Sequence, residues 1–230
     1  MISKILSLLW VLIAIGFLNR CGSTTSSTDL TFKGGGGTLQ ASNPLQLKVK
    51  VYSIYLSTSE FCTSPKQVFN DTSPSYKNVL DHPTLGSASN ADGSWNGTYK
   101  CIIIKMSDVI KFTPATTDGT CQANTEYTLD VCGSGYSTKD INGNSSNCDS
   151  TDNTPYLYLS TASTSEGGTV DDKPWVPPVS GTLTNGFKLQ NAFVVSGAKT
   201  GTFNVDGSGK VDGSSSQGCD MQPPSFSFKE

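Results

Sequence analysis

The sequence contains a single histidine, His82, and only 15% of its residues are charged. Histidine is the commonest general base in enzymes, but His82 lies between Asp81 and Pro83, a combination typical of turns. The P-loop, the nucleophile elbow and the HExxH zinc motif do not occur. No CxxC pair occurs either, and structural zinc sites use closely spaced cysteine and histidine ligands. We therefore expect neither an enzyme nor a bound cofactor.

Long hydrophobic runs, basic stretches and helical periodicity are also scarce. The one apolar run, residues 5–18, is shorter than the ~20 residues that span a membrane. Once residues 1–20 are set aside, 14 basic and 19 acidic residues remain, a net charge of −5. This balance argues against a nucleic-acid partner. No apolar stripe of helical period follows the first run, and the abundant Gly, Ser, Thr, Asn and Asp favour strands and turns.

The N-terminal residues have the features of an export signal. Lys4 and the amino terminus supply positive charge ahead of the apolar run, as in a signal peptide. The run ends at Leu18-Asn19-Arg20-Cys21, and a polar Gly-Ser-Thr segment follows. This pattern resembles a bacterial lipoprotein signal of the spirochaete type, although Arg20 departs from the usual Gly, Ala or Ser. The resemblance implies cleavage before Cys21 and lipidation of its thiol, with palmitate or a related chain.

The resemblance also divides the chain. Residues 1–20 are predicted to form the signal peptide, residues 21–43 a lipidated flexible tether that includes four consecutive glycines, and residues 44–230 a single domain. The alternative is an ordinary signal peptide cut elsewhere, which would leave Cys21 a plain thiol.

Seven cysteines are an odd number for an exported chain. If Cys21 carries lipid, six remain for disulfides, which persist in the periplasm and at cell surfaces. These six are Cys62, Cys101, Cys121, Cys132, Cys148 and Cys219. Six cysteines allow 15 pairings. Our first choice is Cys121–Cys132, which would close a short loop, followed by Cys62–Cys101 and, by elimination, Cys148–Cys219.

Period-2 alternation predicts about eight short strands in an all-β, antiparallel β-sandwich with long Ser/Thr/Asn-rich loops. Residues 45–51 alternate cleanly, and the phase slips at Val51-Tyr52, which predicts a bulge or a crossover between sheets. The apolar run Ile102-Ile103-Ile104 predicts a central strand that is buried on both faces. Further alternation over 126–132 and 225–228 predicts two more strands, and Asp206-Gly207-Ser208-Gly209 predicts a hairpin turn.

The order of these stretches resembles a family of bacterial lipoprotein domains built as transthyretin-like (prealbumin-like) Greek-key sandwiches. The first strand, 47–56, is followed by 96–99 leading into 102–109, and residues 201–206 are similar to the family's final hairpin. The family has no established catalytic residues, so the resemblance implies a fold and no chemistry.

Two Asp-rich stretches are calcium candidates. Asp140, Asn142 and Asn144 offer the first three oxygen ligands of an EF-hand-like loop, and Asp149 and Asp152 could complete a looser site. Against this, Ser145 replaces the required glycine, and an Asx-turn loop explains the same residues. The second stretch, 206–212, carries Lys210 among its ligands and is better explained as a turn.

The stretch 171–175 places two acids, Asp171 and Asp172, beside an exposed-looking Trp175. Tryptophan with paired carboxylates can bind or hydrolyse glycans. The alternative is a proline-rich loop with Trp175 packed on the edge of the sandwich.

Together these features predict an exported, non-enzymatic lipoprotein, anchored to the outer membrane on its periplasmic or cell-surface face. Its long loops are expected to bind an extracellular or envelope protein or a glycan. A periplasmic structural or envelope-assembly lipoprotein is the second hypothesis, and a carbohydrate-active enzyme or sugar-binding module is the third.

Overall fold

A computed structural model of the chain describes residues 29–34, 43–149, 152–169, 171–215 and 218–229. The predicted signal peptide, Cys21 and most of the predicted tether lie outside these ranges. Nearly all of the regular secondary structure in the described part is β, as predicted. Its only helical element is the 3₁₀ turn η1 (Val79–Asp81), which the Asn78 side chain caps.

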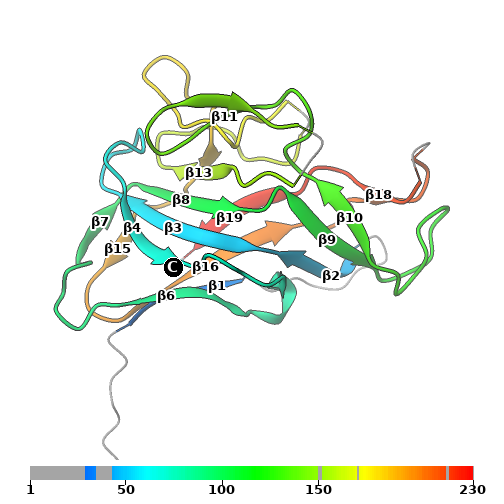
Figure 1. The fold of residues 1–230 in the computed structure, drawn as a ribbon, viewed down its shortest axis with the longest axis horizontal. Coiled ribbons are helices and arrows are strands. Elements are labelled where there is room, and N and C mark those ends of the chain that lie inside the picture. The colour runs from blue at the N-terminus through cyan, green and yellow to red at the C-terminus, as the bar shows by residue number, and fades with distance from the viewer. Residues whose placement is uncertain (1–28, 35–42, 150–151, 170, 216–217, 230) are drawn as a thin grey trace, which may run out of the picture.

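Three sheets of four or five strands build the sandwich (Figure 1). The first sheet has the order β19 (Ser225–Lys229), β16 (Lys199–Asp206), β1 (Asp29–Gly34) and β6 (Thr84–Ser89). The second contains β10 (Tyr127–Asp130), β9 (Val109–Pro114), β2 (Pro44–Val49) and β5 (Lys77–Asn78). The third contains β14 (Phe187–Lys188), β13 (Tyr156–Ser160), β8 (Cys101–Met106), β3 (Val51–Ser57) and β4 (Lys66–Asn70).

Three two-stranded ribbons complete the strands. They pair β11 (Ser137–Lys139) with β12 (Ser145–Asn147), β7 (Gly97–Tyr99) with β15 (Phe193–Val195), and β17 (Val211–Asp212) with β18 (Asp220–Met221). Most pairings are antiparallel, but β1 runs parallel to β16 and β13 runs parallel to β14.

The second and third sheets are joined end to end. Strand β2 continues into β3, and β8 continues into β9, so each pair crosses from one sheet to the other. The predicted irregularity at Val51-Tyr52 is confirmed, since the pairing of β3 with β8 shifts register between Val51 and Ser53. Figure 1 shows this long layer with the first sheet beneath it and the loop region that carries β11 above it.

The predicted central strand is confirmed. Strand β8 lies between β3 and β13, with Ile104 opposite Ile54 and Leu157. Ile102 and Ile104 belong to the main core between the layers, whereas Ile103 joins a second cluster with Tyr55 and Tyr158 on the outer face. Both faces of β8 are therefore covered, which is why its sequence shows no alternation.

Two predictions about segment boundaries are wrong. Residues Asp29–Gly34 fall within the predicted flexible tether, but they form β1 in the middle of the first sheet, with Leu30 and Phe32 fully buried. Residues 206–209 turn the chain but do not join a hairpin, because β16 pairs with β1 and β19 while β17 pairs with β18. The pairing of β1 with β16 joins distant parts of the sequence, so no local pattern predicts it.

Candidate functional site

All six candidate cysteines are paired, and the pairing corrects two of the three predicted bonds. Cys62–Cys101 is confirmed. The other bonds join Cys121 to Cys219 and Cys132 to Cys148. The predicted Cys121–Cys132 bond is wrong: β10 lies between these two cysteines, and each of them is bonded to a different partner.

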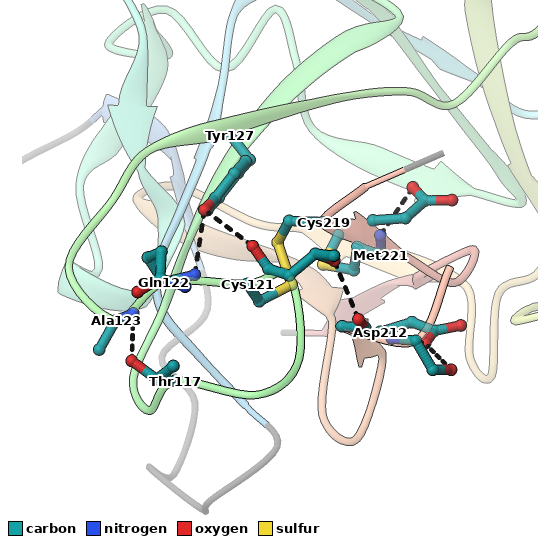
Figure 2. Close-up of a disulfide and its surroundings, with 12 residues drawn as sticks. Thr117, Cys121, Gln122, Ala123, Tyr127, Asp212, Cys219 and Met221 are labelled. Atoms are coloured by element: carbon teal, nitrogen blue, oxygen red, sulfur yellow. Dashed lines mark hydrogen bonds between the residues drawn. A yellow bond between two sulfur atoms is a disulfide. The ribbon is translucent and has the colours of Figure 1, made fainter. Parts of the chain in front are cut away.

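The Cys121–Cys219 bond ties the loop after β9 to the β17–β18 ribbon (Figure 2). Close to it, the Tyr127 hydroxyl accepts a hydrogen bond from the Gln122 amide at 3.0 Å. The two segments also meet at two glycines, Gly119 and Gly213, and the amide of Thr120 donates to the Gly213 carbonyl at 2.9 Å. This disulfide therefore joins parts of the chain that are 98 residues apart.

The Cys132–Cys148 bond closes the loop that carries β11 and β12. The Cys148 amide donates to the Tyr136 carbonyl at 2.9 Å, so the bond also fixes the turn at Tyr136. A carboxyl oxygen of Asp108 and the two sulfurs lie within 4.8 Å of one another. Because the sulfurs are bonded to each other, they are not available as thiolate metal ligands.

The calcium candidates form Asx turns. Asp140 Oδ1 accepts the amides of Asn142 and Asn144 at 2.9 and 2.8 Å, and its Oδ2 accepts the Asn144 side-chain amide at 2.8 Å. These hydrogen bonds lower the pKa of Asp140. Donor groups therefore occupy both oxygens of this carboxylate, which is the arrangement of a polar turn. In the second stretch, Asp206 Oδ1 accepts the Ser208 amide in the same way.

Asp149 and Asp152 lie with two other acids, Asp108 and Asp130. The Asp108 carbonyl accepts the Val131 amide at 2.8 Å. Burial raises the pKa of Asp108 to about 6, and the negative charges of Asp130 and Asp152 add to this rise. Asp130 is exposed, but partial desolvation of its carboxyl raises its pKa, and the charges of Asp149 and Asp152 add to this rise. Lys50 balances part of this charge, with its Nζ 3.7 Å from Asp152.

A pocket of about 110 Å³ lies where β10, the Tyr136 turn, the 169–174 loop and the start of β19 meet. Its walls are mainly apolar side chains: Leu129, Val131, Pro174, Phe187, Pro223 and Phe226. Phe187 stacks on Phe226 with ring centroids 5.8 Å apart, and both rings are almost fully buried. The pocket therefore rests on the core of the sandwich.

Two carboxylates, Asp130 and Asp172, also line this pocket. Asp130 Oδ1 accepts the Cys132 amide at 3.0 Å. Asp172 accepts from the Ser165 hydroxyl at 2.8 Å and from the Thr169 amide at 2.7 Å. These bonds fix the two acidic groups at the margin of an apolar cavity.

The stretch 171–175, which is predicted as a candidate glycan site, supplies part of the pocket lining. Asp172 and Pro174 line it, but Trp175 is fully buried and packs edge-on against Phe226 at 6.3 Å. The tryptophan therefore presents no exposed face to a sugar. The sequence pattern does not single out Asp130, because in an alternating strand it is only one of the outward-facing residues.

Comparison with protein-family models, curated proteins and solved structures finds no match for the chain. Within the described ranges, no helix has the length and apolar character needed to cross a membrane.

Proposed function

We propose that the protein is an exported, lipid-anchored, non-enzymatic lipoprotein that binds a ligand in the pocket lined by Asp130 and Asp172. The observation that supports binding is the pocket itself, an apolar cavity with two fixed carboxylates. Such a combination of apolar walls and a few oriented polar groups is typical of small-ligand sites. We do not assign it a reaction.

Two observations support export and anchoring. The three disulfides use all six cysteines that follow Cys21, which fits a chain that matures in an oxidising compartment. The apolar run and Cys21 form a lipoprotein-like signal, and lipidation would hold the sandwich at the outer membrane.

The anchor is tested by replacing Cys21 with Ser. We expect the variant to move from the detergent phase to the aqueous phase, whereas Ser27→Ala, a change in the following polar segment, leaves the protein in the detergent phase. A Cys21→Ser protein that stays with the membrane contradicts the anchor. Protease digestion of intact cells then separates a cell-surface location from a periplasmic one.

Binding is tested with n-butanol, a small probe with an apolar stem. In methyl NMR spectra we expect saturable shifts at Leu129 and Val131, which line the pocket, and none at Val194, which is exposed on β15. The absence of shifts at Leu129 and Val131 would show that the pocket does not accept small apolar molecules.

A further inference from the structure

We infer that the pocket takes an alkylammonium ion, with its ammonium group at the carboxylates that line the pocket and its stem against the apolar walls. This inference rests on the proposed function, since it names the ligand class of the same pocket. It commits to one chemistry, a protonated amine on a chain of about four carbons.

The charge of the site favours a cation. The described residues that line the pocket include two acids and no Lys, Arg or His. Asp130 also lies near Asp149 and Asp152, whose negative charges make its ionised form less favourable. A bound ammonium ion would relieve this repulsion, and a carboxylate or phosphate ligand would increase it.

The carboxylates of Asp130 and Asp172 still have acceptor positions open for an ammonium group. Each carboxylate oxygen can accept two hydrogen bonds. The contacts from Ser165 and Thr169 take one acceptor position on each oxygen of Asp172. Asp130 accepts from the Cys132 amide through Oδ1. An ammonium group has three N–H donors, so it can fill the acceptor positions that these contacts leave open.

The size and lining of the cavity define the rest of the ligand. A cavity of about 150 Å³ with apolar walls accommodates benzene. The volume here, about 110 Å³, therefore suits a short aliphatic chain better than a ring system. The Phe187–Phe226 stack forms an apolar surface against which methylene groups can pack. A lysine side chain and a free alkylamine share this chemistry.

The test compares three probes of equal length by NMR titration: n-butylammonium, n-butanol and butyrate. We expect n-butylammonium to bind at least about tenfold more tightly than n-butanol, the difference that a charge-assisted hydrogen bond provides. Butyrate should bind more weakly than both. The substitutions Asp130→Asn and Asp172→Asn should each remove most of the preference for n-butylammonium over n-butanol.

The matched control is Asp171→Asn, which changes an exposed acid that does not line the pocket and should leave the preference intact. Circular dichroism of each variant checks that it folds. Equal affinities for n-butylammonium and n-butanol would overturn the inference but keep the pocket as a binding site. Failure of all three probes to bind would overturn the proposed binding function as well.

A second experiment asks whether the amine belongs to a lysine of a polypeptide or to a free small molecule. Nα-acetyl-lysine methylamide is compared with its norleucine analogue, which has the same stem without the charge. Preference for the lysine compound supports a polypeptide ligand, and preference for free n-butylammonium over the lysine compound supports a small amine. Equal binding of lysine and norleucine compounds would contradict the cation requirement.

Discussion

A carboxyl oxygen of Asp108 lies within 4.8 Å of the sulfur of Cys132. Asp108 is fully buried, its Oδ1 accepts the Asn153 amide at 2.7 Å, and its Oδ2 has no hydrogen-bond partner among the described residues. A buried ionised carboxylate with an unpaired oxygen is unfavourable, so the group retains its proton to a higher pH than usual.

This burial predicts a pH dependence of stability. The pKa of Asp108 rises from 3.8 to about 6 on folding. The folded state then holds the proton more tightly, so the contribution of Asp108 to the free energy of unfolding is highest below about pH 4. It falls as the pH rises through about 6, by about 3 kcal/mol in total.

The substitution Asp108→Asn should remove this dependence while keeping the bond from Asn153. We expect urea denaturation to show that the difference in unfolding free energy between wild type and Asp108→Asn changes between about pH 4 and pH 7. The control is Asp206→Asn, an exposed acid that also accepts one backbone amide. A constant difference between wild type and Asp108→Asn would contradict the prediction.

The two-sided burial of β8 predicts similar costs on its two faces. Ile104→Ala removes packing between the layers, and Ile103→Ala removes packing beneath the outer loops. Each should lower the free energy of unfolding by about 2–5 kcal/mol. Val194→Ala, at a position 46% exposed on β15, should change it by less than about 0.5 kcal/mol. A small effect at Ile103 alone would mean that the outer cluster is not a core.

The disulfides should differ in their contributions to stability. Cys121–Cys219 closes a separation of 98 residues and Cys132–Cys148 closes one of 16. In the chain-entropy account, losing the longer link should cost about 1.5 kcal/mol more. We expect Cys121→Ser with Cys219→Ser to unfold at lower urea than Cys132→Ser with Cys148→Ser. Mass spectrometry of unreduced peptides checks the pairing, and a peptide linking Cys121 to Cys132 would refute it.

The contact between Gly213 and Asp118 predicts that Gly213 cannot carry a side chain. A Cβ at residue 213 would lie 1.6 Å from the Asp118 carbonyl oxygen. Because backbone atoms must move to make room, Gly213→Ala should cost about 1–3 kcal/mol. Gly133→Ala is the control, since its Cβ would meet only Tyr136 at 3.8 Å. Equal melting temperatures for the two variants would show that the segments containing Gly213 and Asp118 are not packed this closely.

The sequence could predict features that depend on local pattern. Alternation identifies a strand because successive side chains point to opposite faces, and it located β2, β10 and β19. The slip at Val51-Tyr52 marked the crossover between sheets for the same reason. The apolar run of β8 indicated burial on both sides. The even number of cysteines after Cys21 predicted three disulfides, although not their partners.

The sequence indicated some of the residues that line the pocket but not the others. Asp172 and Pro174 belong to the stretch 171–175, which the sequence marked as a candidate glycan site. Asp130, Phe187 and Phe226 come from separate strands, and nothing in their neighbours along the chain indicates that they meet.

The amino-acid sequence by itself determined the β class, the strand that is buried on both faces and the number of disulfides, because residue spacing and composition set these locally. Only the tertiary structure decided that Asp29–Gly34 is a central strand and that Cys121 pairs with Cys219. Each of these depends on a partner distant in sequence. Such contacts depend on how the layers pack together, and no short stretch of sequence contains both partners.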